Sequence, residues 1–293
     1  MNGQIDSIAV IGAGRLGSSL AVALDAAAYP THAIASRDPA SAEALAGRLG
    51  DWANAMTSAE AVEASDLVFL TVPDAEIAPL VASLSWRKGQ AVVHCSGALG
   101  LDVLAPATEA GAIAGCFHPL QTFPSRDGES WRFEDVACGI EGADPLGAAL
   151  ELLAGDLGAS VVRLEGVDRG LYHAAAVFSS NYTVAVAAAA QRAWTLAGLP
   201  TEQAQSALSP LQLAASRNVA GNDLVDALTG PIARGDIATV ERQLSALDAL
   251  DAGADAGAEL GRLYRQLGSE LLRLELGHAP DVLERLRSLL GAS

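Results

Sequence analysis

The first half of the chain alternates short apolar runs with longer segments of helical periodicity. Five runs rich in Val, Ile and Ala predict strands, at 7–11, 32–36, 67–72, 91–94 and 112–117. The segments between them predict helices, at 16–28, 39–49, 74–84 and 101–110. A strand at 136–140, a helix near 145–157 and a strand at 160–164 continue the pattern. Such alternation is typical of a mostly parallel, doubly wound α/β sheet.

Strand signals stop after Gly166, and the rest of the chain shows helical periodicity interrupted by turn residues. The predicted interruptions fall at Gly198-Leu199-Pro200, Ser209-Pro210, Gly230-Pro231 and 277–280. Because the pattern changes so sharply, we expect an α/β domain at 1–166 and an all-α domain at 167–293.

Composition narrows the possible partners. The 293 residues are 51% hydrophobic but only 4% aromatic, and the net charge is −17. This charge argues against a nucleic-acid partner and against an anionic membrane surface. The three cysteines, Cys95, Cys116 and Cys138, lack the spacing of a disulfide framework or a zinc site. We therefore expect no bound metal and, since the first seven residues have no basic stretch, a cytoplasmic protein without a signal peptide.

An uncharged stretch between Arg169 and Arg192 is long enough to resemble a membrane span. Its centre, however, is the polar run Ser-Ser-Asn-Tyr-Thr at 179–183, and the rest is mostly alanine. Polar groups at that depth are costly in lipid. The stretch therefore predicts a helix buried in protein.

Residues 7–17 read Ser-Ile-Ala-Val-Ile-Gly-Ala-Gly-Arg-Leu-Gly, an apolar strand that leads directly into a helix. In this context the G-x-G-x-x-G pattern is typical of a Rossmann-type dinucleotide-binding domain. We predict that Gly12 forms the tight turn, Gly14 lets a pyrophosphate approach the backbone, and Gly17 allows close packing of helix on strand. The predicted cofactor-binding residues of this turn are Gly12, Ala13, Gly14, Arg15, Leu16 and Gly17. A glycine turn without a ligand is the alternative.

The end of the second predicted strand favours NADP(H) over NAD(H). An NAD enzyme usually has an acidic residue there, whereas this strand ends with Ser36 and Arg37. Arg37 offers a planar donor fork to a 2′-phosphate, and Ser36 offers a hydroxyl. The alternative is that Asp38 binds the ribose of NAD, but Asp38-Pro39 is also a good helix start, which already accounts for the acid.

Candidate reacting groups follow the later strands. Val72-Pro73 is predicted to pass the ribose on the nicotinamide side, and Ser96 is a candidate hydrogen-bonding residue. His118, after the strand that ends at Phe117, is the main candidate acid/base. The alternative is that His118 only bonds to neighbouring backbone. His94 is expected to be a core histidine whose hydrogen bonds are satisfied.

The predicted helix at 171–191 carries further polar candidates. His173, Val177 and Asn181 follow one face, which would meet cofactor and substrate, a dimer partner, or both. In a later turn, Arg234 is a candidate clamp for a substrate carboxylate, and Asp236 is expected to cap the following helix.

Four motifs together resemble a known group of proteins. They are the glycine motif, Cys-Phe-His-Pro-Leu-Gln-Thr-Phe, Leu-Tyr-His-Ala-Ala-Ala-Val-Phe-Ser-Ser-Asn-Tyr and Leu-Thr-Gly-Pro-Ile-Ala-Arg-Gly-Asp. They are similar to bacterial Rossmann-like oxidoreductases with a C-terminal helical domain of unknown function. That group resembles pyrroline-5-carboxylate reductase, ketopantoate reductase and the 6-phosphogluconate dehydrogenase superfamily. The resemblance implies NADP binding, a helical second domain, and homodimers formed through it.

The resemblance also implies two site residues and one departure. His118-Pro119 is similar to the His-Pro of prephenate dehydrogenases. Asn181 is similar to the asparagine of the Lys-x-x-x-Asn helix in ketopantoate and hydroxyacid enzymes. The lysine position of that motif holds Val177 here. We therefore expect His118 or His173 to supply the proton.

These observations predict an NADP-dependent oxidoreductase that transfers hydride to a C=O or C=N bond of a small, carboxylated metabolite. The predicted catalytic residues are His118, Ser96, Asn181 and His173, with Arg234 as the substrate-binding residue. The alternative is a non-catalytic NADP-binding dimer that acts as a sensor or an assembly subunit.

Overall fold

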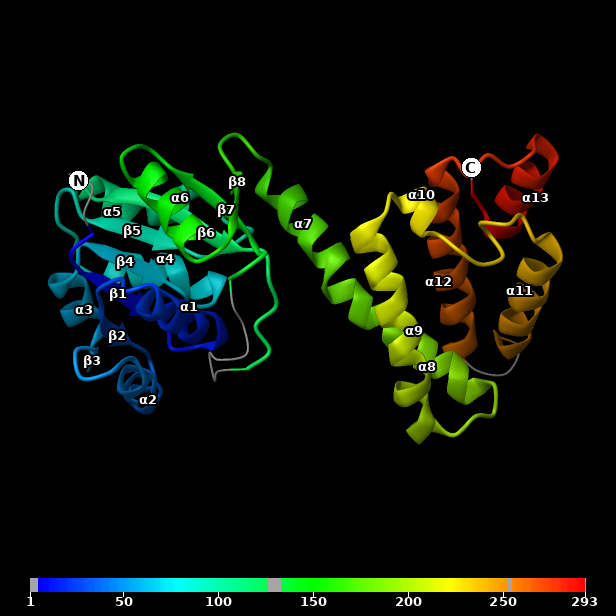
Figure 1. Cartoon of the computed structure of the whole chain (residues 1–293), viewed down its shortest axis with the longest axis horizontal. Helices are drawn as coiled ribbons and strands as arrows, with labels where there is room; N and C mark the ends of the chain where they lie inside the picture. The colour runs from blue at the N-terminus through cyan, green and yellow to red at the C-terminus, as the bar shows by residue number, and fades with distance from the viewer. Residues whose placement is uncertain (1–4, 126–132, 252–254, 293) are drawn as a thin grey trace. The chain divides into compact units, whose positions relative to one another are not determined.

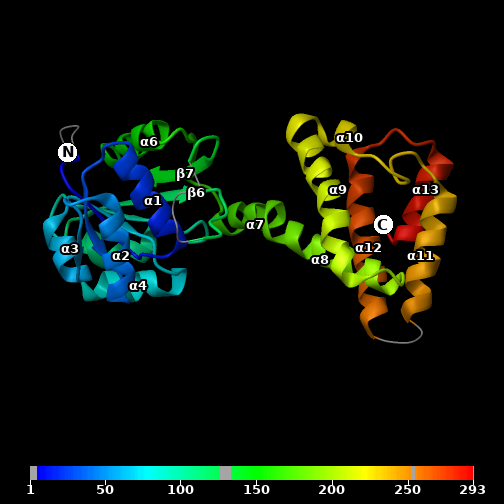
Figure 2. The same cartoon turned by 60° about the horizontal axis from the view of Figure 1, so that its bottom comes forward.

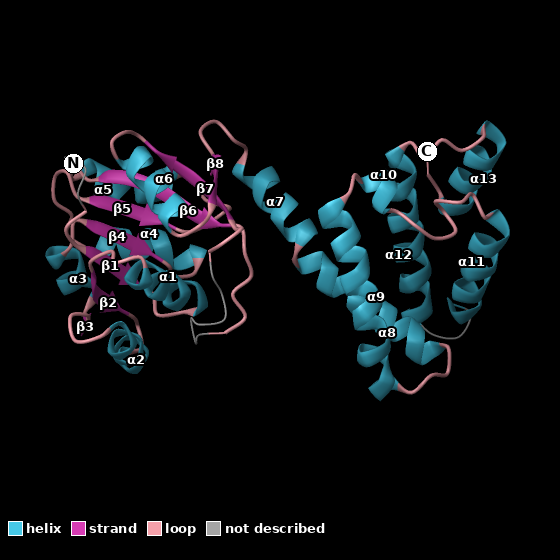
Figure 3. Cartoon of the chain, in the orientation of Figure 1, coloured by secondary structure: helices cyan, strands magenta, loops and turns pink. Residues whose placement is uncertain are grey.

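The computed structural model describes residues 5–125, 133–251 and 255–292. Contacts divide the chain into two compact units, Met1–Ser180 and Asn181–Ser293. The first is an α/β unit and the second is helical (Figures 1 and 3), which confirms the expected fold class. The expected boundary at residue 166 precedes helix α7 (Arg169–Ser179), which this division assigns to the first unit.

The first unit is built on an eight-stranded sheet, in the described residues, with the order β3-β2-β1-β4-β5-β6-β7-β8. The strands are β1 (Ile8–Ile11), β2 (Thr31–Ala35), β3 (Asn54–Met56), β4 (Leu67–Leu70), β5 (Ala91–His94), β6 (Ile113–Pro119), β7 (Ala137–Gly142) and β8 (Ser160–Arg163). Every neighbouring pair is parallel except β6 and β7. Because Ile11, Leu70, His94 and Cys116 lie at one level, the residues that follow them share one edge of the sheet.

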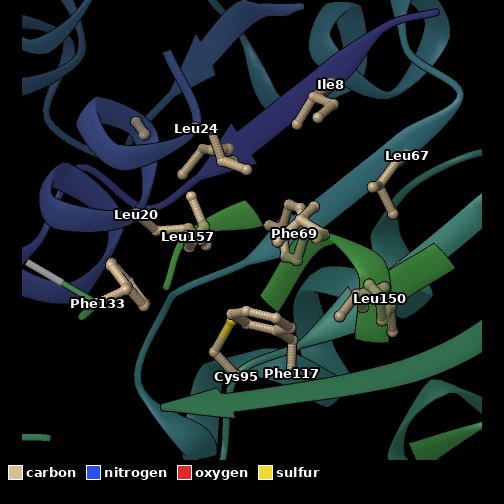
Figure 4. Close-up of a cluster of buried hydrophobic side chains, with 14 of the residues drawn as sticks. Ile8, Leu20, Leu24, Leu67, Phe69, Cys95, Phe117, Phe133, Leu150 and Leu157 are labelled. Carbon is tan, nitrogen blue, oxygen red and sulfur yellow. The ribbon is translucent and has the colours of Figure 1, made fainter. Parts of the chain in front are cut away.

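Helices cover both faces of this sheet. Buried side chains of α1 (Arg15–Ala26), α2 (Pro39–Leu49) and α6 (Leu146–Asp156) pack on one face. Those of α3 (Ser58–Ala64), α4 (Asp74–Ser83) and α5 (Ala105–Glu109), with the short helix η1 (Leu101–Leu104), pack on the other. Figure 4 shows the first cluster, where the rings of Phe69 and Phe117 meet edge to face with centroids 5.9 Å apart. Full burial of each such side chain contributes about 2 kcal/mol.

Two features of the sheet differ from the sequence expectation. Strand β6 does not end at Phe117 but continues to Pro119, because β7 pairs with it antiparallel and places Gly139 opposite His118. His118 is thus a strand residue. Strand β3 and helix α3 were not predicted; Thr57 and Glu60 form a capping box at the start of α3.

The second unit consists, in its described part, of α8 (Asn181–Leu196), α9 (Thr201–Gly221), α10 (Leu224–Ala227), α11 (Ile237–Asp251), α12 (Asp255–Leu271), η2 (Leu272–Leu274) and α13 (Pro280–Leu290), seen from two sides in Figures 1 and 2. Its core gathers Leu and other aliphatic side chains of α11, α13 and the segments beside them. Asp236 caps α11 as expected, since its carboxylate accepts from Thr239 N at 3.1 Å. Within the described segments, no helix combines the length and apolarity that crossing a bilayer requires.

Two expected helix boundaries in this region are wrong. The break at Ser209-Pro210 does not occur, because α9 continues through Pro210, which removes only one backbone donor from a 21-residue helix. The predicted helix at 171–191 is instead divided, with α7 ending at Ser179 and α8 starting at Asn181. Serine side chains compete for backbone hydrogen bonds and favour such an end. His173 and Asn181 therefore do not share one helix face.

Helices α8 and α9 bury very little of their surface. No residue of α8 is buried, and Ala204 is the one buried residue of α9. Large apolar side chains remain exposed along both helices, namely Tyr182, Val184, Val186, Leu196, Leu211, Leu213 and Val219. Both helices therefore carry apolar side chains that the described chain leaves uncovered.

Candidate functional site

The glycine-rich turn after β1 is a tightly packed structure. Gly12 has φ +119°, and a Cβ there would lie 2.8 Å from the carbonyl oxygen of Thr71. A Cβ on Gly17 would collide with the Gly12 carbonyl oxygen, so Gly17 allows the close packing predicted for it. The Thr71 hydroxyl donates to the Gly12 carbonyl at 2.8 Å and ties the turn to β4.

The start of α1 is open where a phosphate group would approach. Nothing lies within 4 Å of a Cβ built on Gly14, the residue that precedes the helix. The first turn of α1 has no acidic residue, and Arg15 is its first residue. Unpaired N–H groups and the helix dipole favour an anion at such a position.

The remaining predicted cofactor residues lie along the same sheet edge. Ser36 and Arg37 follow β2, with Arg37 exposed, and Val72-Pro73 follow β4 and lead into α4. Ala13 is buried in the turn itself, and Leu16 packs against the core. Because β2, β1 and β4 are neighbours in the sheet, all these segments lie together at the carboxyl ends of the three strands.

Asp38 stands at the predicted N-cap position of α2, and Pro39 is the first helical residue. Its carboxylate, however, accepts from the Ser41 hydroxyl at 2.6 Å and makes no side-chain cap hydrogen bond. Asp38 also lines a cavity of about 290 Å³ between the glycine turn and α2. The acid therefore remains close to where a ribose would be recognised.

A second cluster of polar side chains lies at this edge, around His118 of β6. Its Nδ1 lies 2.8 Å from the hydroxyl of Tyr172 in α7, and the two rings meet edge to face. Burial, then the neighbouring His173 and Arg169, lower the pKa of His118 to about 4. The imidazole is therefore neutral at pH 7.

Gly97, after β5, brings His118 and His173 together. A Cβ on Gly97 would lie 2.7 Å from His118 Nε2 and 2.8 Å from His173 Nδ1. The two imidazole rings have centroids 6.1 Å apart, and His173 Nδ1 is buried without a hydrogen-bond partner among the described residues. We call Gly97, His118 and His173 the imidazole cradle.

Ser96 and His94 lie at the end of β5, close to Gly97 in sequence. The Ser96 hydroxyl donates to Asp74 at 2.7 Å and accepts from the N–H groups of Ala98 and Leu99 at 3.2 Å each. His94 is fully buried, and burial lowers its pKa to about 4. The expectation of satisfied hydrogen bonds is wrong, because Nδ1 accepts from Ser96 N while Nε2 has no hydrogen-bond partner in the part of the chain that the structure describes.

An ion pair fixes the start of α7. Asp168 caps the helix by accepting from Leu171 N at 3.0 Å. The next residue, Arg169, is 9% exposed, pairs with Glu141 of β7 and also donates to Cys116 Sγ at 3.6 Å. A buried guanidinium of this kind requires such partners. The pair sets α7 against β6 and β7.

Sequence reasoning thus found one part of this cluster and missed another. It named Ser96, His118 and His173, which the fold brings to neighbouring positions. Asn181 and Arg234 belong to the second unit, where Asn181 begins α8 and Arg234 is exposed between α10 and α11.

Tyr172, Arg169, Glu141 and Asp74 were not named. Tyr172 could have been found from the sequence, because it is a polar residue next to His173 in an otherwise apolar helix. The pairing of Arg169 with Glu141 depends on the antiparallel β7 and left no signal in the sequence.

A mostly parallel sheet with a glycine-rich turn after its first strand, followed by a helical region, defines a Rossmann-like protein of two parts. Two family models agree: a Rossmann-like domain matches residues 3–119, and a domain of unknown function, DUF2520, matches residues 136–271. The chain thus carries a Rossmann-like domain followed by a DUF2520 domain. Among curated proteins, no sequence matches it significantly.

Solved structures extend this comparison. A protein from Bacteroides fragilis, provisionally described as an NADP oxidoreductase, is 26% identical with a TM-score of 0.68, covering 90% of this chain and 96% of that one. A reductive aminase from Aspergillus terreus in complex with NADPH and ethyl-5-oxohexanoate is 18% identical, with a TM-score of 0.61 and coverage of 98% and 93%.

A 1-pyrroline-5-carboxylate reductase from Streptococcus pyogenes is 18% identical, with a TM-score of 0.57 and coverage of 97% and 96%. The aminase and this reductase share the fold alone. The family resemblance expected from the sequence is confirmed.

Proposed function

We propose that this protein is an NADP-dependent oxidoreductase that reduces a C=O or C=N bond of a small metabolite. The observation that carries the proposal is the common sheet edge of the glycine-rich turn and the imidazole cradle. Three strand spacings, about 14 Å, separate β1 from β6 at that edge. Ligands of open α/β sheets bind outside the carboxyl ends of the strands, where both clusters lie.

The residues at the turn fit a dinucleotide. The open space at Gly14 leaves room for a pyrophosphate at the start of α1, and the absence of an acid in its first turn removes repulsion. Arg37 and Ser36 would hold the 2′-phosphate, with Arg15 adding positive charge. Asp38 works against a 2′-phosphate, so the preference for NADP depends on Arg37.

The nicotinamide supplies hydride when the cofactor is bound. The chain would then orient the substrate, exclude water and deliver a proton. His118 is the proposed acid/base, because its Nε2 faces Gly97 in the imidazole cradle and has no hydrogen-bond partner in the described part of the chain. His173 is the proposed second polar group, since its Nδ1 also lacks a partner there.

Arg234, within the second unit, is proposed as a residue that binds a carboxylate. The loop of Arg234 is fixed at both ends, because His278 Nε2 bonds the Ile232 carbonyl oxygen at 2.8 Å and Asp236 caps α11. The exposed guanidinium is therefore presented by a rigid turn. Asn181 is proposed as a further hydrogen-bonding residue for the substrate.

Cofactor binding gives the first test. We expect NADPH to bind the whole chain, and Gly14→Ala to weaken that binding at least tenfold, about 1.4 kcal/mol, because a methyl group would fill the open space. Gly47→Ala is the matched control, since its Cβ also meets nothing within 4 Å but lies in α2. Calorimetry that detects no NADPH binding by the natural chain overturns the proposal.

Turnover gives the second test. NADPH oxidation is followed with a panel of ketones, aldehydes and imines, with and without a carboxylate. His118→Asn should lower kcat by about 100-fold without changing the Kd for NADPH. Equal activity of the variant would remove His118 from the chemistry.

A non-catalytic NADP-binding dimer is the second candidate. Val177 favours it, because the lysine of related helices is absent from this position. NADPH binding that is weakened by Gly14→Ala, combined with no turnover across the panel, would support this candidate over the first.

We also propose a cytoplasmic homodimer formed through α8 and α9. Their exposed apolar side chains, with Val184 at 70% and Leu211 at 68%, need a partner to cover them. A second copy supplies the same apolar side chains in a self-complementary interface. Light scattering should give twice the chain mass for the natural protein and the chain mass for Val184→Glu with Leu211→Glu; a monomeric natural protein would contradict this proposal.

A further inference from the structure

The phenol of Tyr172 packs against His118 of β6 and Gly139 of β7, and we call this position its seat. Its hydroxyl lies 2.8 Å from His118 Nδ1, and the ring centroids of the two residues are 5.5 Å apart at an interplanar angle of 76°. Gly139 lies opposite His118 in the strand pair, and a Cβ on it would collide with the Tyr172 hydroxyl. The seat therefore requires glycine at this position.

The contacts at the start of α7 hold the tyrosine in this seat. Asp168 caps the helix, and Arg169 is tied to Glu141 of β7 and to Cys116 of β6. Tyr172 follows three residues after Arg169, which places it one helical turn further along the same side. The hydroxyl is thus fixed on the β6–β7 pair from two directions.

This geometry assigns the proton of the imidazole. In the described part of the chain, His118 Nδ1 is the one hydrogen-bond acceptor within reach of the Tyr172 hydroxyl. With the hydroxyl as the donor to Nδ1, the neutral imidazole carries its own proton on Nε2. Nε2 is the nitrogen that faces Gly97 in the cradle.

We propose that Tyr172 and His118 form a two-residue proton relay, with His118 in contact with the substrate and Tyr172 behind it as the residue that positions and resupplies the imidazole. The geometry of the relay stands by itself, whereas its use in turnover rests on the proposed function.

A relay explains how a neutral imidazole can donate a proton to the substrate. With a pKa of about 4, caused by burial, His173 and Arg169, His118 has no imidazolium proton to give at pH 7. A neutral imidazole can release its Nε2 proton only if Nδ1 receives another. Burial raises the pKa of Tyr172 to about 12, so its hydroxyl keeps a proton available at neutral pH.

The charged and titratable groups around this pair come from every element that packs on it. They are Asp74 of α4, His94 of β5, Cys116 of β6, Cys138 of β7, and Arg169 and His173 of α7. The burial of the pair adds the largest contribution to both shifts.

The step balances as follows. The substrate carbon receives hydride from the reduced nicotinamide, and the π electron pair moves to the oxygen or nitrogen. That atom takes the Nε2 proton of His118, while Nδ1 takes the hydroxyl proton of Tyr172. The phenolate then regains a proton from solvent, so the cofactor is oxidised, the double bond is reduced, and the chain returns to its starting state.

The direct test is the protonation of His118, read by nitrogen NMR of the full chain labelled with ¹⁵N-histidine. We expect the natural protein at pH 7 to show His118 as the neutral tautomer with the proton on Nε2. Tyr172→Phe should change this to a mixture of both tautomers, because Nδ1 loses its donor. Tyr29→Phe is the matched control, since it removes a hydroxyl bonded to Asp156 elsewhere in the same unit.

A second pair of variants guards against loss of folding in Tyr172→Phe. Gly139→Ala should displace the hydroxyl and produce the same NMR change, whereas Gly142→Ala on the same strand should not, because its Cβ would meet its neighbours at an ordinary 3.6 Å. A natural protein with the proton on Nδ1, or unchanged His118 signals in both Tyr172→Phe and Gly139→Ala, overturns the relay.

Turnover separates the relay from the proposed function. With a substrate found in the panel, Tyr172→Phe should lower kcat by about 100-fold with little change in KM. If no substrate is turned over, the NMR result still decides the tautomer. If turnover is unchanged in Tyr172→Phe, the oxidoreductase proposal stands and the relay is wrong.

Discussion

The backbone of Gly97 lies directly against the imidazole of His118, so that a Cβ at residue 97 would stand 2.7 Å from Nε2. The same Cβ would stand 2.8 Å from Nδ1 of His173. Two nitrogens that lack partners in the described residues thus both lie next to residue 97, which has no side chain. The spacing of the two histidines therefore depends on a residue that has no chemistry of its own.

Gly97→Ala should separate the two imidazoles and lower turnover by about 100-fold, since positioning errors of this size are costly. NADPH affinity should change little, because the glycine-rich turn is on β1. The measurement is kcat beside a calorimetric Kd for NADPH. Gly155→Ala, which meets nothing within 4 Å, is the control; retained kcat in Gly97→Ala would contradict the prediction.

Stability should fall between about pH 6.5 and pH 4. Burial lowers the folded pKa values of His94 and His118 from the ordinary value of 6.5 to about 4 each. The unfolded chain then binds more protons in this window, so lower pH favours unfolding, by up to about 1.4 kcal/mol per pH unit for each histidine. Urea unfolding at several pH values checks this. A flat profile in the natural chain would show that neither histidine is held neutral.

Cofactor preference should depend on two adjacent residues. Arg37→Ala should weaken NADPH binding about tenfold more than NADH binding, because a charge-assisted hydrogen bond to a phosphate contributes about 1.5–3 kcal/mol. Asp38→Asn should strengthen NADPH binding, since it removes a negative charge beside that phosphate. Calorimetric titration of both nucleotides gives the ratios. Equal losses for both nucleotides in Arg37→Ala would mean that this residue does not read the 2′-phosphate.

The ion pair between Arg169 at the start of α7 and Glu141 should stabilise the folded chain. Arg169→Met leaves the Glu141 carboxylate without its cation, and loss of one partner of a buried pair costs about 3–5 kcal/mol. Because Glu141 is 23% exposed, we expect the lower end of this range. The free energy of unfolding from urea titration measures it, and Arg163→Met, whose pair with Glu151 is on the surface, serves as the control. A loss below about 1 kcal/mol would exclude an anchoring role.

The elements with strong local signals were predicted well from the sequence. The glycine motif, the apolar strands beside it and the cap at Asp236 depend on local pattern, and each is present in the fold. The capping box of Thr57 and Glu60 was a local signal too, and it would have located α3.

Features that depend on tertiary pairing could not be predicted in this way. The antiparallel β7 extends β6 to Pro119 and brings Gly139 under Tyr172, although nothing near His118 in the sequence indicates it. The division of the predicted helix at Ser180 likewise reflects a boundary between compact units.

The pairing of Arg169 with Glu141 has a consequence for how this architecture can diversify. Glu141 of β7 already neutralises that guanidinium, so under the proposed function the first unit would protonate a reacting group without favouring an anionic substrate. Under the proposed function, residues such as Arg234, beyond residue 180, would recognise substrate charge instead. Exchange of the helical part between relatives should alter which compounds are accepted while the proton chemistry is inherited unchanged.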